Sequence, residues 1–354
     1  MQPKDRVITT LCHEEADAVP LFDFLYNEIS LRKILREKSK RIDPEMYMKA
    51  QLSLGFDLVC LFFDEPEESR LKCSSKDTFV NEWGIRNKVV DGMGWYVDGT
   101  IKTEQDLEDF YPPDPYAEGR SRTIHSILKN HGELTACAPA VSGPFTHGWS
   151  MTGFDVFAKA MYRDPSFIHK LLGIVNRYFI ELGKMVIDEG AEFIWIADDF
   201  GDVHGPMVTP KCFREFILPY FKEQVQVFKK KGVWILLHCD GNVMPIMKDL
   251  VDAGIHAFHP VERKANMRLS DIKGAYGDQV TIVGNVEASN LIPHGSFEEI
   301  DSQIRECFEM AAPGGGYIFA SDHSIHPGIS AERAQFVFQR AEKYRFYPRK
   351  AYLG

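Results

Sequence analysis

The stretches EFIWIADDF (192–200) and VWILLHCDG (233–241) decide the fold that this sequence predicts. Each has the length of a strand, is rich in Ile, Leu and Phe, and ends in acidic or histidine side chains. Similar runs recur at AVPLFDF (18–24), DLVCLFF (57–63), LTACAPAV (134–141), AFHPVE (257–262), VTIVGNVE (280–287) and YIFASDHS (317–324). Apolar runs that do not alternate with polar residues are typical of parallel strands covered on both faces.

The segments between these runs have the spacing of amphipathic helices. We expect helices over residues 165–189, 210–231, 297–311 and 330–345. Thr209 and Pro210 are typical of a helix start, and Ser296 with Glu299 forms a capping-box pattern. Eight strands that alternate with helices predict an α/β fold of the (β/α)8 TIM barrel type rather than an open doubly wound sheet. No GxGxxG motif follows the first strand, so a dinucleotide site has no support.

One connection is too long for a simple crossover. We expect a single (β/α)8 barrel domain over residues 1–354, with an inserted excursion at about 64–133 between the second and third strands. Its stretch TFVNEWGIRNKVVDGMGWYVDGT (78–100) predicts a hairpin with an Asp-Gly turn. Helices are expected at 103–110 and at about 120–131.

Composition excludes several classes of function. The chain of 354 residues has 41 basic and 51 acidic side chains and a net charge of −10, which argues against a nucleic-acid-binding face. Seven cysteines without a CxxC pair do not form a disulfide framework and suit a reducing cytoplasm. No apolar run reaches the length of about 18 residues that a membrane span needs, so we expect a cytoplasmic protein.

The polar ends of the strands predict the site, because active sites of such barrels lie at the carboxyl ends of the strands. His238 and Asp240 are two residues apart and share one strand face. Together with His323 they could bind a divalent ion through nitrogen and carboxylate oxygen. The alternative is that each histidine is a hydrogen-bonded structural residue, which is the commoner role of a single His at a strand end.

The fourth run ends in two adjacent acids. Alternation places Asp199 on the face of Trp195 and Ala197, and Asp198 on the opposite face. We expect Asp199 to face the lumen as the catalytic residue, and Asp198 to brace the following loop through backbone amides. Both acids could instead be caps without a substrate role. The aromatic segment 145–151 is either a plain loop or a wall of the substrate site.

Five motifs together carry a family resemblance. RVITTLCHEEADAVP, DDFGDVHGPMVTPKCFREFILPY, LLHCDGNVMPIMKDLVDAGIHAFHPVE, YGDQVTIVGNVE and GGGYIFASDHSIHPGIS resemble the uroporphyrinogen decarboxylase superfamily, and within it the cobalamin-dependent methyltransferase branch. The resemblance spans nearly the whole chain in motif order and implies a (β/α)8 barrel. The decarboxylase itself implies an arginine-rich loop after the first strand, whereas PLFDFLYNEIS (20–30) has no arginine before Arg32.

The methyltransferase branch implies a zinc site and a reaction. Its H-x-C motif and later Cys fall on His238, Asp240 and His323, and Glu262 is the candidate for a further ligand. A site of histidine and carboxylate is harder than a thiolate site and is a better Lewis acid for an oxygen ligand. The resemblance therefore implies a zinc-dependent O-demethylase component. It would transfer a methyl group from a small O-methyl donor, most simply a methoxylated aromatic, to cob(I)alamin on a partner corrinoid protein.

The remaining site residues follow from this hypothesis. Asp199 would orient a donor hydroxyl or hold a zinc-bound water, and the donor would be lined by Phe22, Tyr26, Phe145, Trp149 and Phe200. The chain has no DxHxxG pattern of its own, so cobalamin would come with the partner, which would dock at the carboxyl-end rim. Alternatives are another methyl donor or a thiol acceptor, a uroporphyrinogen decarboxylase-like lyase, and a binding protein without activity.

Overall fold

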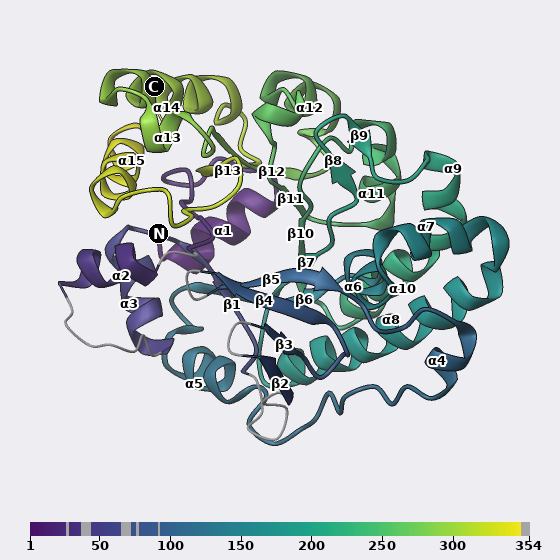
Figure 1. Cartoon of the computed structure of the whole chain (residues 1–354). Helices are drawn as coiled ribbons and strands as arrows, with labels where there is room; N and C mark the ends of the chain where they lie inside the picture. The colour runs from purple at the N-terminus through teal and green to yellow at the C-terminus, as the bar shows by residue number, and fades with distance from the viewer. Residues whose placement is uncertain (26–27, 37–43, 65–71, 76–77, 91–92, 348–354) are drawn as a thin grey trace.

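Seven parallel strands form one curved sheet in the order β1-β6-β7-β10-β11-β12-β13 (Figure 1). The computed structural model describes residues 1–25, 28–36, 44–64, 72–75, 78–90 and 93–347. The seven strands are β1 (Leu58–Leu61), β6 (Ala136–Ser142), β7 (Phe193–Ala197), β10 (Trp234–His238), β11 (Ala257–His259), β12 (Thr281–Val286) and β13 (Tyr317–Ser321). Six of them lie within runs predicted from the sequence, and β6 extends one residue beyond its run, 134–141.

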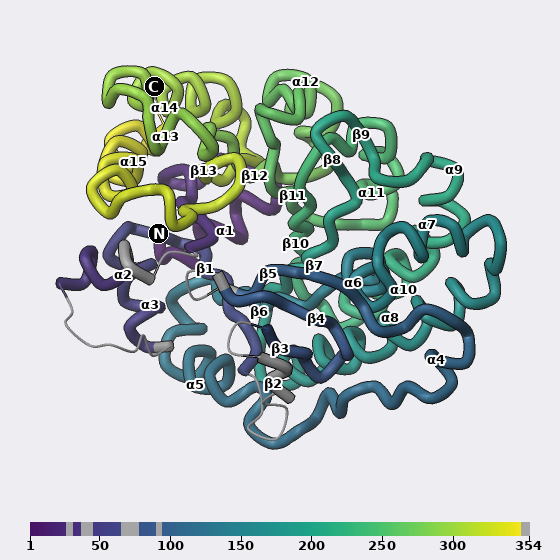
Figure 2. Tube along the Cα trace, viewed as in Figure 1, coloured from purple at the N-terminus to yellow at the C-terminus, as the bar shows by residue number. Residues whose placement is uncertain are grey.

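Residues 18–25 occupy the place of the eighth strand, between β13 and β1. Leu21 and Leu25 make parallel bridges to Phe319 and Ile325, and the amides of Asp57 and Leu58 donate to the Leu21 carbonyl. The trace in Figure 2 shows this N-terminal segment beside β13. The segment makes isolated bridges rather than a regular ladder, and it completes the (β/α)8 TIM barrel that the sequence predicts.

Helices cover the outside of the barrel. They are α5 (Arg122–His131), α8 (Pro165–Asp188), α10 (Leu218–Lys230), α11 (Met247–Ala253), α12 (Leu269–Tyr276), α14 (Phe297–Ala311) and α15 (Ala331–Tyr344). Shorter or peripheral helices are α2 (Glu28–Leu35), α3 (Pro44–Ser53), α7 (Phe154–Arg163), α9 (Pro210–Cys212) and α13 (Leu291–His294). The capping box of Ser296 and Glu299 and the Thr209 cap are both present, as predicted.

Two segments differ from the sequence prediction. The expected continuous helix 210–231 contains a π-helical turn at Phe213–Ile217. Pro219, which follows, has no N–H to donate to the carbonyl four residues earlier, and the wider turn accommodates that gap. The aromatic segment 145–151, expected as a loop, lies in helix α6 (Pro144–Thr152), which begins with a proline in its first turn.

The excursion holds an antiparallel sheet of four strands rather than a hairpin: β2 (Lys72–Ser75), β3 (Thr78–Val80), β4 (Arg86–Val90) and β5 (Met93–Asp98). The expected Asp-Gly turn at 91–92 lies outside the described residues. The predicted helices are present as α4 (Glu104–Glu108) and α5. The edge strand β5 packs against α6, where the Tyr96 and Trp149 rings meet edge to face with centroids 5.2 Å apart.

The lumen of the barrel is filled by apolar side chains and is closed at its amino end by helix α1 (Pro3–Leu11). Val7 and Leu11 of this helix pack with Phe22, Leu58 and Ala136 in one buried cluster, which continues upward to Trp195. The Thr281 hydroxyl also donates to the Thr10 carbonyl at 3.1 Å, which ties α1 to β12. Any opening to the lumen therefore lies at the opposite end.

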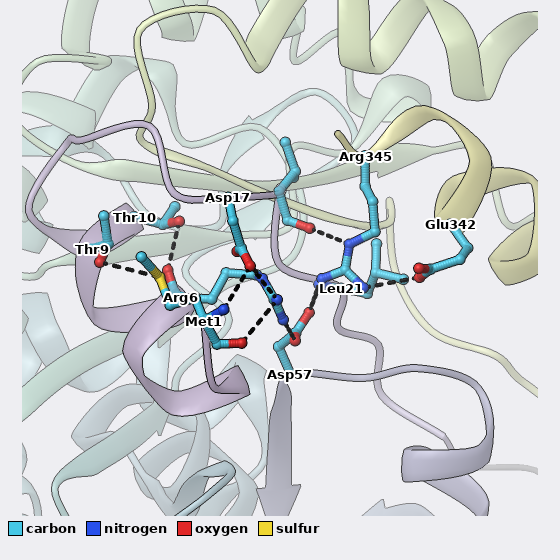
Figure 3. A network of polar contacts seen from close by, with 10 residues as sticks. Met1, Arg6, Thr9, Thr10, Asp17, Leu21, Asp57, Glu342 and Arg345 are labelled. Carbon is cyan, nitrogen blue, oxygen red and sulfur yellow. Dashed lines mark hydrogen bonds and ion pairs between the residues drawn. The ribbon is translucent and has the colours of Figure 1, made fainter. Parts of the chain in front are cut away.

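The buried carboxylate of Asp57 connects the N-terminal and C-terminal segments of the barrel (Figure 3). Asp57, 2% exposed, accepts hydrogen bonds from Arg6 Nη1 at 2.5 Å, from Arg345 Nη2 and from the Leu21 amide at 2.9 Å. Arg345 also donates to the Val19 carbonyl at 2.9 Å. This group, which we call the Asp57 clasp, links α1, the irregular eighth strand, β1 and the end of α15.

Within the described ranges, no helix has both the length and the apolar character that crossing a bilayer requires.

Candidate metal centre

The register of two neighbouring strands brings two acids together at the carboxyl end of the sheet. His238 of β10 lies opposite Ala197 of β7. Asp240 and Asp199 each come two residues after this pair, so the register places the two acids next to each other. The Asp240 amide donates to Asp199 Oδ1 at 3.1 Å. The alternation predicted along 193–199 is confirmed, because Phe193 and Trp195 lie in the lumen cluster while Asp198 is buried on the other face.

Asp199, His238 and Asp240 form a triad of possible metal ligands. Their donor atoms lie within 4.8 Å of one another. His238 Nε2 is 3.8 Å from Asp199 Oδ1 and 3.7 Å from Asp240 Oδ2. The other Asp240 oxygen, Oδ1, is buried and has no hydrogen-bond partner among the described residues.

These residues fit a divalent cation. One imidazole nitrogen between two carboxylates is a ligand set that zinc and related ions accept. A buried carboxylate oxygen without a donor costs free energy, and a cation beside it removes that cost. The unpartnered Asp240 Oδ1 is therefore the observation that favours an ion here.

His323 and Glu262, the other two predicted ligands, adjoin the triad through Asp240 and the turn that follows it. His323 Nε2 is 3.3 Å from Asp240 Oδ2, and its side chain is 49% exposed. Glu262 Oε2 accepts a hydrogen bond from the Gly241 amide at 2.8 Å. Glu262 thus holds the turn after Asp240, and His323 lies on the solvent side of the triad.

The turn itself requires glycine. Gly241 has a φ of +83°, and a Cβ placed there would lie 2.4 Å from the carbonyl carbon of Gly201. A Cβ on Gly201 would in turn lie 2.5 Å from the Asp240 carbonyl oxygen. The loops after β7 and β10 are therefore in backbone contact, which sets the separation of Asp199 and Asp240.

The acids and histidines of the cluster shift one another's pKa values in both directions. Burial raises the pKa of Asp240, but the nearby His238 and His323 outweigh that effect and hold it below its ordinary value. Burial raises the pKa of Asp199, against the opposing effect of His238. The hydrogen bond with Asp240 raises the pKa of His323 to about 9, so His323 is protonated near neutral pH.

Asp198 stabilises the start of helix α6 and not, as expected from the sequence, the loop that follows its own strand. Its two oxygens accept the amides of Phe145 at 3.0 Å and Thr146 at 2.6 Å, in the first turn of α6. Burial raises the pKa of Asp198 to about 7, against these amide donors. The Thr146 hydroxyl then accepts the Asp199 amide at 2.8 Å, so α6 and the triad are connected.

We expect Asp198→Asn to lower the free energy of unfolding by about 1–3 kcal/mol, because one amide of α6 then faces an NH2 group instead of an acceptor. Asp199→Asn makes the same chemical change one residue along and is the matched control. It should keep the melting temperature and lose metal. Urea denaturation and metal analysis of both variants test this, and the reverse pattern would show that the two acids have exchanged roles.

The predicted aromatic lining is divided between two layers of the molecule. Phe22, fully buried, lies in the lumen and stacks on Trp195 with centroids 5.1 Å apart. Phe145 and Phe200 are buried outside the barrel, where they pack with each other and with helix side chains. Trp149 is half-buried beside Tyr96, and Tyr26 lies outside the described residues.

Sequence reasoning gave no site role to three lumen residues that lie beneath the triad. Phe24 lies with its ring centroid 4.9 Å from that of His238, and Trp195 and His259 pack beside it. Alternation from Phe22 could have identified Phe24, since residues two apart share a face. No pattern in the sequence pairs His259 with His238, because that contact depends on the register between β10 and β11.

Comparison with known proteins agrees with this architecture. The family model for uroporphyrinogen decarboxylase (URO-D) matches residues 78–344, and the chain belongs to this family. It is similar to the uroporphyrinogen decarboxylase of Myxococcus xanthus, with 23% identity over 363 residues that cover 100% of this chain and 97% of the relative. The decarboxylase of Chlorobium phaeobacteroides is 27% identical over 284 residues, 75% of this chain and 78% of the relative.

Among solved structures, a methyltransferase from Methanosarcina mazei has a similar fold. Its TM-score is 0.77 at 20% identity, with 97% of this chain and 99% of that chain covered. Family membership and this likeness together indicate an enzyme with a TIM-barrel fold.

Proposed function

We propose that this protein is a zinc-dependent methyltransferase that takes a methyl group from a small O-methyl donor, a methoxylated aromatic, and transfers it to cob(I)alamin on a partner corrinoid protein. The observation that carries the proposal is the triad of Asp199, His238 and Asp240 at the carboxyl end of the barrel. An oxygen-rich centre suits an oxygen donor better than a thiol.

The lumen surface supports this choice over the decarboxylase. The first barrel segment points Phe22 and Phe24 into the lumen. A tetrapyrrole with many carboxylates requires cations, which these two positions do not supply. Aromatic side chains beneath a metal centre give it an apolar floor that suits an aromatic ether. We assign Phe22 and Phe24, both buried, to this floor rather than to direct contact with the donor.

The chain would bind the ion through the triad, with Glu262 fixing the turn after Asp240. A divalent ion in this place would supply a Lewis acid for the ether oxygen of the donor. Asp199, the half-exposed member of the triad, would be the ligand nearest the donor. This assignment replaces the hydroxyl-orienting role expected from the sequence.

His323 would supply the proton. Methyl transfer breaks the O–CH3 bond, leaves the electron pair on oxygen and passes the methyl group to the reduced corrinoid. His323 is half-exposed at the triad, and an imidazole exchanges its proton near neutral pH, so it can donate to the departing oxygen and recover a proton from solvent. We therefore place it beside the ligand set rather than within it.

Mixing the purified protein with a reduced corrinoid protein and a methoxylated aromatic is expected to give the absorbance change of corrinoid methylation. The partner would dock transiently at the carboxyl-end rim. His323→Gln should slow the change by about 100-fold or more and keep its zinc, as for loss of a general acid. Efficient demethylation without any corrinoid would contradict the proposal.

A decarboxylase-like lyase is the second candidate, since the curated relatives described above are named uroporphyrinogen decarboxylases. Loss of carboxyl groups from uroporphyrinogen by the metal-free protein would favour it over methyl transfer.

A further inference from the structure

A fully buried histidine lies directly beneath the candidate metal centre. His259 ends β11 and is opposite His238 in the strand register. Its exposed fraction is 0%, and the rings of Phe22, Phe24 and Trp195 surround it with centroids 5.1–5.9 Å away. His259 therefore reaches neither solvent nor a donor molecule directly, and any role in the site must pass through His238.

One hydrogen bond joins the two imidazoles. His238 Nδ1 and His259 Nδ1 are 2.8 Å apart, so one nitrogen donates and the other accepts. The opposite nitrogen of His238, Nε2, faces the carboxylates of Asp199 and Asp240. A metal ion requires the lone pair of a neutral imidazole nitrogen. With the ion on Nε2, the His238 proton must lie on Nδ1, and His259 Nδ1 must accept it.

We propose that His259 is a positioning residue for the metal ligand His238. By accepting the Nδ1–H bond it fixes the tautomer and the plane of the His238 ring, so that the Nε2 lone pair points at the ion. The inference rests on the proposed metal centre and is independent of which methyl donor the enzyme uses. Hydrogen bonds of this kind orient metal-bound histidines and raise their basicity.

The surroundings of His259 keep it able to accept. His259 is fully buried among the Phe22, Phe24 and Trp195 rings, where an added positive charge would be costly, so the ring stays neutral and keeps one lone pair. When Nδ1 accepts, the second proton of the pair lies on His259 Nε2, which is buried without a hydrogen-bond partner among the described residues. The Phe22 and Trp195 rings stand at 85° and 75° to the imidazole, and an N–H can point at a ring face in that geometry.

Three variants test the proposal through the zinc dissociation constant, measured by competition with a chromogenic chelator. His259→Phe removes the acceptor and should weaken zinc binding about 10–100-fold. His259→Asn places an oxygen near the Nδ1 position and should restore most of the affinity. His256→Phe is the matched control, since His256 Nδ1 accepts the Ile235 amide at 2.9 Å near the other end of β11. It should lower the melting temperature and leave zinc affinity unchanged.

Nitrogen-15 NMR of the zinc-loaded wild-type protein, labelled at histidine, gives a second readout that needs no variant to fold. We expect His238 to carry its proton on Nδ1 and His259 to carry its proton on Nε2. A proton on His259 Nδ1, or unchanged zinc affinity in a folded His259→Phe, overturns the inference. A wild-type protein that binds no zinc overturns both it and the metal centre. Zinc binding without methyl transfer to a corrinoid overturns only the proposed reaction.

Discussion

His238→Ala is expected to lose zinc and to lower methyl transfer by about 1,000-fold or more. The substitution removes the one nitrogen of the triad and leaves Asp199 and Asp240 as adjacent carboxylates without a cation between them. A Lewis acid contributes several kcal/mol to such a reaction, and about 4 kcal/mol corresponds to this factor. Elemental analysis should give roughly one zinc per chain in the wild type and little in the variant.

The fold should survive this change, because the side chains of the barrel core do not depend on the ion. His204→Ala is the matched control, since His204 is an exposed histidine in the turn between the short strands β8 (Gly201–Asp202) and β9 (Gly205–Pro206). It should keep both zinc and activity. Full zinc content in His238→Ala would refute the assignment of the metal centre.

Asp57→Ala is expected to destabilise the protein by about 3–5 kcal/mol, the usual cost of removing one partner from a buried ion pair. It leaves the guanidinium of Arg345, 5% exposed, with the half-exposed Glu342 as its remaining carboxylate, and it also removes the acceptor of the Leu21 amide. Urea denaturation followed by circular dichroism measures the loss.

An exposed ion pair provides the control for this stability measurement. Asp252→Ala breaks the contact of Asp252 with Lys248 on α11, where both side chains are largely exposed. The expected loss is at most about 0.5 kcal/mol. Equal effects of Asp57→Ala and Asp252→Ala would mean that the Asp57 clasp contributes little to the stability of the barrel.

The strands and most helices could be predicted because their signals are local. The apolar runs and the capping box of Ser296 and Glu299 act over a few residues, and the structure has both. Helix α6 was missed because its helical start depends on Asp198, which is distant in sequence and accepts the amides of its first turn. The regular strand expected over residues 18–24 is absent, because isolated bridges and the Asp57 clasp hold this segment in place of a continuous ladder.

The sequence predicts which residues contribute to the site, but not which of them lie next to one another. Alternation along one strand correctly placed Asp199 on the lumen face. The neighbours of each group depend on the register between strands, which sets Ala197 opposite His238 and His238 opposite His259. No periodicity within a single run contains that information. The same limit explains why Phe145 and Phe200, aromatic and close to the rim in sequence, lie outside the barrel.

Helix α1 has a consequence for the order of events in the proposed reaction. Its side chains Val7 and Leu11 seal the amino end of the lumen, so the small donor and the large corrinoid partner would use the same entrance. A docked partner would then block the donor's path. The donor would have to enter first, and the demethylated product could leave only after the partner has gone. A high concentration of the partner would therefore slow the cycle by occupying enzyme that has not yet bound its donor.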